Sequence, residues 1–252
     1  MATQSVRIGW RPYVNPIVPL ISSGLGFSYD AFDSTSYPGT GNIFYDISGN
    51  NRNMTITPKV IAPGVLDNGA AFNTSGGIKR FGFVADGGYG SNSYGGVSYS
   101  PSITSGFTFG GWVKTNTNGG YTFQKGADGI YGGWDIIFSV GSVNLSLSLL
   151  NTSYQGVGIS GNITLTNNTW YYVTGQYIHN VGLKIYVNGV LTNTLNQSGL
   201  QMVNRGTGWT INSVATNIMG RSIVSTYHVY TRVLTSDEIL QNFNSNKSRY
   251  GY

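Results

Sequence analysis

The stretch Leu183–Leu191, LKIYVNGVL, decides the fold class. Apolar and polar residues alternate up to Asn188-Gly189, and Asn-Gly supplies the two positive φ angles of a two-residue type I′ turn. The same period of two runs through residues 107–113, FTFGGWV, and through residues 136–149, where the turn falls at Gly141-Ser142. These patterns predict antiparallel hairpins with one buried face.

Short strand-like segments separated by turns cover most of the chain. The composition agrees with this, because 37 glycines, 18 tyrosines and 25 asparagines are typical of many short strands joined by tight turns. We predict an all-β fold, a two-sheet antiparallel jelly-roll sandwich over residues 23–252. Further strands are expected at residues 26–30, 54–60, 70–73, 78–84, 170–178, 209–211, 218–221 and 227–233.

Residues 1–22 differ from the rest of the chain. Pro12, Pro16 and Pro19 each lack an amide donor, so the stretch is poorly suited to a central strand. It is also too apolar for a free linker. We therefore expect an extended, Pro-rich N-terminal arm that lies either against its own domain or against another chain.

One short helix is expected near the C-terminus. Thr235-Ser-Asp-Glu238 has the capping-box pattern, in which the threonine hydroxyl and the glutamate each accept from a free amide at the helix start. Ile239, Leu240 and Phe243 follow as an apolar stripe. We expect this helix to cover one edge of the sandwich.

Charge and leader patterns exclude several classes of function. The net charge of +5 is spread along the chain without a dense basic run, which argues against nucleic-acid binding. Prolines break the apolar run of the first residues, so we expect neither a signal peptide nor a membrane span. With no cysteine in the chain, disulfides and thiolate metal sites are excluded.

Four stretches resemble LamG-like jelly-roll domains of the concanavalin A-like lectin/glucanase class, as found in bacteriophage virions. They are residues 27–50, with Tyr37-Pro38-Gly39 and an Asp46-to-Asn50 turn; FTFGGWV; residues 170–190, with WYYV and KIYVNGV; and residues 230–251, YTRVLTSDEILQNF with its tail. Each also has a purely local interpretation: Tyr37-Pro38-Gly39 is a tight turn, and Asp46 and Asn50 can bond nearby amides. The resemblance implies the fold and suggests a binding role.

No catalytic constellation is found, and we predict that the chain is not an enzyme. Glycosidases need two carboxylates, yet Glu238 is the one glutamate and is explained by the capping box. Asp128 with Asp135 is the nearest alternative pair. His179 and His228 lack a nucleophile or a third ligand beside them.

No cofactor and no metal site are expected. Relatives that bind calcium carry an aspartate where this chain has the neutral Asn73 region, which would leave at most a weak Ca²⁺ site. Asp30, Asp67 and Asp86 are the carboxylates that could form one. Asp30 and Asp33 could also share a cation, although bonding of a strand-end carboxylate to nearby backbone is favoured.

Two glycine-rich segments, residues 86–99 and 117–134, are predicted to be surface loops. Aromatic side chains on such loops can contact sugars or proteins, or can fold onto their own sandwich. The candidate glycan-binding residues are Tyr89, Tyr94, Tyr99, Tyr121, Tyr131 and Trp134.

The resemblance and the arm together predict a bacteriophage virion structural or accessory protein, such as a capsid decoration protein or a tail- or fibre-associated protein. It would assemble in the host cytoplasm and bind the major capsid protein or tail proteins, and it could also form a homo-oligomer. The alternative is a carbohydrate-binding adhesion module for host-surface glycans. The arm residues expected to contact the particle are Arg7, Trp10, Arg11 and Tyr13.

Overall fold

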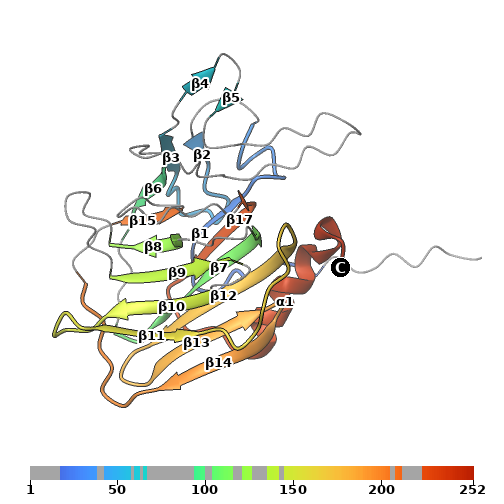
Figure 1. The fold of residues 1–252 in the computed structure, drawn as a ribbon. Helices are drawn as coiled ribbons and strands as arrows, with labels where there is room; N and C mark the ends of the chain where they lie inside the picture. Colours follow the sequence, from blue (N-terminus) through green and yellow to red (C-terminus); the bar gives the residue numbers. More distant parts are fainter. Residues whose placement is uncertain are drawn as a thin grey trace, which may run out of the picture.

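The structure is a computed structural model that describes part of the chain. The described residues are 18–38, 43–57, 60–62, 65–66, 94–99, 104–115, 121–126, 135–141, 145–204, 208–211 and 223–252. They form two stacked antiparallel sheets and one C-terminal helix (Figure 1). The predicted all-β sandwich with a short C-terminal helix is therefore confirmed. The expected strands at residues 70–73, 78–84 and 218–221 lie outside the described residues.

Sheet A has the strand order β1-β17-β7-β12-β13-β14, with β16 pairing with β7. The Asn188-Gly189 turn joins β13 to β14, and both of its residues have positive φ, 51° and 82°, as predicted. The strands of sheet A are β1 (Leu25–Asp30), β7 (Phe107–Lys114), β12 (Trp170–Ile178), β13 (Gly182–Val187), β14 (Val190–Asn196), β16 (Ile223–Val224) and β17 (Thr226–Tyr230).

Sheet B has the strand order β11-β10-β9-β8-β15-β6-β3-β2. The predicted hairpin around residues 141 and 142 is present as β9 paired with β10. The strands of sheet B are β2 (Ile43–Phe44), β3 (Met54–Thr57), β6 (Tyr94–Ser98), β8 (Tyr121–Lys125), β9 (Ile136–Val140), β10 (Leu145–Leu150), β11 (Gly156–Ser160) and β15 (Gly208–Ile211). A separate pair joins β4 (Val60–Ala62) to β5 (Val65–Leu66).

The main core fills the space between the two sheets. It contains the inward positions of the predicted alternating strands, including Phe107 and Phe109 of β7 and Leu145, Leu147 and Leu149 of β10. Because successive side chains of a strand point to opposite faces, the residues between them point away from this core. Each sheet therefore has a second, outward face whose composition decides what it can bind.

Three sequence predictions about the elements were wrong. Residues 94–98, expected in a loop, form β6, because pairing with both β3 and β15 overrides the low strand propensity of the glycines. Residues 121–125, also expected in a loop, form β8 between β9 and β15. The single strand expected at 54–60 is divided into β3 and β4, and Pro58 in the interval has no amide to donate.

The helix α1 (Ser236–Asn246) covers a face of sheet A, where we had predicted that it would cover an edge (Figure 1). The physical reason is the aromatic character of that outward face. Phe243 packs with Trp112 and Tyr172, and Ile239 packs with Tyr186 and Tyr230. Aromatic side chains on both faces of a sheet require a covering layer on each side.

Candidate binding surfaces

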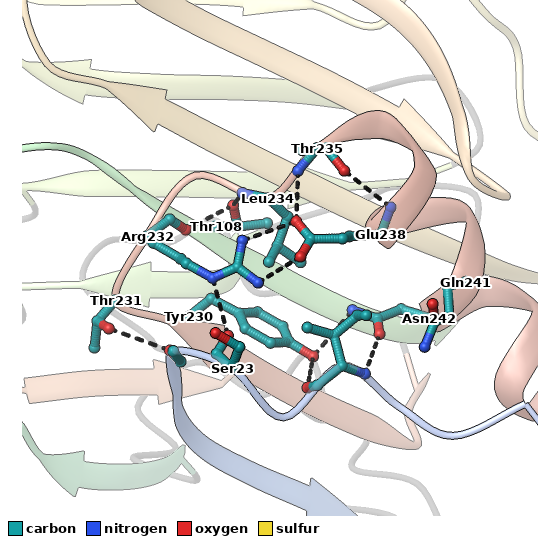
Figure 2. Close-up of polar contacts among 12 residues, drawn as sticks. Ser23, Thr108, Tyr230, Thr231, Arg232, Leu234, Thr235, Glu238, Gln241 and Asn242 are labelled. Atoms are coloured by element: carbon teal, nitrogen blue, oxygen red, sulfur yellow. Dashed lines mark hydrogen bonds and ion pairs between the residues drawn. The ribbon is translucent and has the colours of Figure 1, made fainter.

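Residues 19–23, which we call the strap, bind to the domain beside α1 (Figure 2). Its peptide groups make the contacts. Asn242 Oδ1 accepts from the Ile21 amide at 2.8 Å, and the Tyr230 hydroxyl donates to the Ile21 carbonyl at 3.0 Å. Gln241 Nε2 donates to the Pro19 carbonyl at 2.9 Å. The last residues of the predicted arm are therefore part of the domain, and residues 1–17, with Arg7, Trp10, Arg11 and Tyr13, lie outside the described residues.

The start of α1 and the end of the strap share one ion pair. Arg232 donates to both carboxylate oxygens of Glu238, at 2.8 and 2.5 Å, and its Nε donates to the Ser23 carbonyl at 3.0 Å. Glu238 also completes the predicted capping box with Thr235, which is confirmed. The Arg232 guanidinium lowers the pKa of Glu238 to about 2. Glu238 therefore has a structural role.

The outward face of sheet A is closed by the C-terminal segment. Beyond α1, the short 3₁₀ helix η1 (Lys247–Tyr250) brings the Tyr250 ring onto Trp112, with ring centroids 4.0 Å apart. Tyr252 donates to the Trp170 carbonyl at 2.6 Å, and Arg249 pairs with Asp30 at 2.6 Å. The helix, η1 and the strap thus occupy this face, which leaves sheet B as the candidate ligand surface.

One row of residues on the outward face of sheet B runs in register across seven strands, and each of its members except Ile137 is polar or glycine. Pairing aligns Thr55 of β3, Gly96 of β6, Thr210 of β15, Gln124 of β8, Ile137 of β9, Ser148 of β10 and Gly158 of β11. A second row aligns Ser139, Ser146 and Ser160. Neither row contains a charged residue. Hydroxyls and amides without charge are suited to hydrogen bonding with a neutral polar ligand.

Accessibility of this face rises toward the β10–β11 hairpin. Ser146 and Ser148 are half-buried, and Gly158 and Ser160 are exposed. In the middle of the sheet, Gln124 is 0% exposed, and neither of its amide heteroatoms has a hydrogen-bond partner. Gln124, Ile137 and Ser139 are all buried, so the part of this face that a ligand can reach is that of β10 and β11.

The six candidate glycan-binding aromatics are not brought together among the described residues. Tyr89, Tyr131 and Trp134 lie outside them. Tyr94 and Tyr121 lie in β6 and β8, so the prediction that they occupy loops is wrong, whereas their contact with glycans stays a prediction.

Tyr99 follows β6 and is half-buried. The Arg52 guanidinium carbon lies 3.7 Å from its ring centroid, and Phe27 meets the ring edge-on at 6.2 Å. One face of the Tyr99 ring is therefore covered by Arg52. A sugar contacting this tyrosine would have to use the remaining ring surface or the hydroxyl.

The carboxylates considered for catalysis or calcium are engaged in structure where they are described. Asp135 is 0% exposed and pairs with Lys125 at 2.9 Å, so it is closed to a substrate; Asp128 lies outside the described residues. Asp30 accepts from the Phe32 amide and pairs with Arg249. Asp67 and Asp86 lie outside the described part of the chain.

Asp33 and Asp46 are likewise committed to local bonds. Asp33 accepts from the Thr35 amide and hydroxyl, and Asp46 accepts from the amides of Ser28, Ser48 and Arg52, as the turn interpretation predicted for Asp46. The residues that the structure describes contain no group of three or more metal-ligating side chains. They also contain no helix long and apolar enough to cross a membrane.

The two stacked antiparallel sheets with the C-terminal helix are the fold of a lectin-like β-sandwich. A sequence profile described as the concanavalin A-like lectin/glucanases superfamily matches residues 86–240. The chain belongs to this superfamily. No curated protein matches the sequence.

Several solved structures share the fold. The binding domain of botulinum neurotoxin DC in complex with rat synaptotagmin II has a TM-score of 0.59 at 16% identity, covering 89% of this chain and 52% of that chain. The binding domain of Paraclostridial mosquitocidal protein 1 gives 0.61 at 17%, with coverages of 89% and 52%. A third structure is of botulinum neurotoxin type C, a toxin whose cell entry is dependent upon interaction with two ganglioside molecules. Its TM-score is 0.56 at 16% identity, covering 89% of this chain and 52% of that chain. The chain spans about half the length of these structures.

The strap contacts and the sheet B rows were not identified from the sequence. The rows had a usable signal, because the residues between Leu145, Leu147 and Leu149 must point away from the core. The sequence contained no signal for the strap contacts, because Ile21 and Asn242 are 221 positions apart.

Proposed function

We propose that this protein is a non-enzymatic adhesion module that recognises glycans on a host surface through the outward face of sheet B. The observation that carries the proposal is the accessible, uncharged patch on β10 and β11, formed by Ser146, Ser148, Gly158 and Ser160. Hydroxyl-rich ligands are recognised by side-chain hydroxyls and amides at short range. The known ganglioside dependence of one structural neighbour supports this use of the fold.

The test is a glycan-array and titration experiment on the folded full chain. Micromolar to millimolar binding of a glycan is expected, with chemical-shift changes on the strands of sheet B and not on those of sheet A. Substitution of Tyr89, Tyr94 or Trp134 by alanine is expected to weaken glycan binding. A folded sample that binds no glycan at millimolar concentration contradicts the proposal.

A second proposal, compatible with the first, is that the chain is a bacteriophage virion accessory protein that docks through its N-terminal arm. Its support is the LamG-like closing motif, together with the apolar, Pro-rich sequence of the arm. The partners would be the major capsid protein or tail proteins, on a virion assembled in the host cytoplasm.

Co-sedimentation with particles that lack the protein tests the docking proposal. The truncation should remove residues 1–17 only, because removing residue 21 also removes contacts that belong to the fold. Binding by the full chain and loss of binding by residues 18–252 is expected. Equal binding by both forms would contradict arm docking and leave glycan recognition unaffected.

A further inference from the structure

The strap occupies a slot whose chemistry is that of a peptide-binding site. The slot lies between β17 and α1 and binds the strap mainly through its peptide groups: the Ile21 amide and carbonyl, and the carbonyls of Pro19 and Ser23 (Figure 2). The partners on the domain are the side chains of Tyr230, Arg232, Gln241 and Asn242. Main-chain bonding supplies affinity without depending on the peptide's side chains.

The slot itself is well ordered by other contacts. Asn242 is 1% exposed, and its Nδ2 donates to the Tyr230 hydroxyl at 2.9 Å, so both groups are oriented toward Ile21. Arg232 is held by its two bonds to Glu238. A slot that is organised by its own hydrogen bonds does not depend on which chain supplies the strap.

One apolar contact selects the strap sequence. Ile21 packs on the cluster formed by Tyr186, Tyr230, Leu234 and Ile239. An acceptable occupant is therefore an extended segment with an aliphatic residue at its centre. The strap of a second copy has the same sequence and therefore meets this requirement.

The strap is joined to β1 by a tight turn. The Leu25 amide donates to the Ser22 carbonyl at 3.1 Å, and Gly24 has a φ of +74°, which disfavours other residues. A Cβ on Gly24 would lie 3.0 Å from Arg232 Cγ and Cδ. Opening this turn redirects the strap, and a strap placed in the slot of another copy regains the same contacts.

We propose that the slot accepts the strap of a second copy, so that two chains form a dimer by reciprocal strap exchange. The exchange opens the turn at residues 22–25 and retains the slot contacts of Pro19 and Ile21 in each half of the dimer. It is independent of glycan recognition, because the outward face of sheet B does not take part.

The chain has no cysteine, so an engineered pair reports exchange directly. Pro19→Cys and Gln241→Cys place thiols at two positions that are joined by a hydrogen bond in the closed form. After refolding over a range of protein concentrations, a short bifunctional maleimide would link them. A closed monomer gives an internally linked single chain, and an exchanged dimer gives covalently linked dimers and circles of two chains. We expect the dimer fraction to rise with concentration.

Gly24→Val perturbs the turn, and Gly199→Val in the same background controls for backbone strain alone, because a Cβ at Gly199 has no atom within 4 Å whereas one at Gly24 also meets Arg232. Both positions have positive φ, +74° and +76°, and both substitutions strain the backbone, but only Gly24 lies in the turn that must open. Gly24→Val should raise the dimer fraction several-fold and Gly199→Val should not. A free peptide with the sequence of residues 18–23, VPLISS, should suppress dimers, and the same peptide with Ile21→Asp should not.

Internally linked monomer alone at every concentration, in the background pair and with Gly24→Val, overturns the proposal. So does a dimer that the VPLISS peptide leaves unchanged, because such a dimer would not use the slot. If Gly24→Val fails to fold, the concentration dependence of the background pair still decides between exchange and no exchange.

Discussion

His228 should make the stability of this protein fall between pH 7 and pH 5. The imidazole lies on the outward face of sheet A at 3% exposure, with Nδ1 2.9 Å from Ser28 Oγ and Nε2 without a partner. Burial lowers its pKa from 6.5 to about 4. The unfolded chain therefore binds a proton in this pH range and the folded chain does not, so stability rises with pH between about 4 and 6.5 and is lost as pH falls.

The magnitude follows from these two pKa values. A full difference from 6.5 to about 4, at 1.36 kcal/mol per pH unit, sets a ceiling of about 3 kcal/mol. Between pH 7 and pH 5 only part of this is realised, and the linkage relation gives about 2 kcal/mol. Glu238, whose pKa is lowered by Arg232, loses its contribution mainly below its ordinary value of 4.5 and adds little in this range.

Urea unfolding of the wild-type chain at pH 7 and pH 5 measures this difference. His228→Gln should abolish the loss of about 2 kcal/mol between the two pH values. His179→Gln is the matched control, because it makes the same substitution at the other histidine of the chain, which is half-buried. An unchanged pH dependence in His228→Gln would refute the reasoning.

Three further substitutions test other parts of the fold through the free energy of unfolding. Thr235→Ala should cost about 1 kcal/mol because it removes the capping hydroxyl, and Thr235→Ser should restore most of it; equal stability of the two would contradict the capping role. Lys125→Met should cost about 3–5 kcal/mol because it removes the ion-pair partner of buried Asp135, and replacing both residues by apolar ones should recover much of the loss. Tyr250→Ala should cost about 3 kcal/mol and change the tryptophan emission, since its ring stacks on Trp112; unaltered emission would argue against that packing.

The parts of the fold that could be predicted are those with a local cause. The β13–β14 turn depends on Asn188-Gly189, the capping box on two residues three positions apart, and the inward face of β10 on strict alternation. Each of these is decided within about ten residues. These elements are present in the structure where the patterns placed them.

The parts that could not be predicted depend on long-range pairing. The glycines of β6 are unfavourable in isolation and become strand only through bonds to β3 and β15. The strap is bound by residues more than 200 positions away. The sequence did contain a signal for the placement of α1 on a face of sheet A. Trp112, Tyr172 and Tyr186 are aromatic residues at outward positions, and such residues need a covering layer.

The central claim, that the outward face of sheet B binds glycans, is tested most directly by blocking that face. Ser148→Arg places a long side chain beside Gly158 on the face without entering the core, and Ser153→Arg adds the same charge in the exposed turn after β10. The measurement is the affinity for the best glycan found on an array. The account predicts at least a roughly tenfold loss for Ser148→Arg and wild-type affinity for Ser153→Arg. Equal binding by both variants, with both folded, would contradict it.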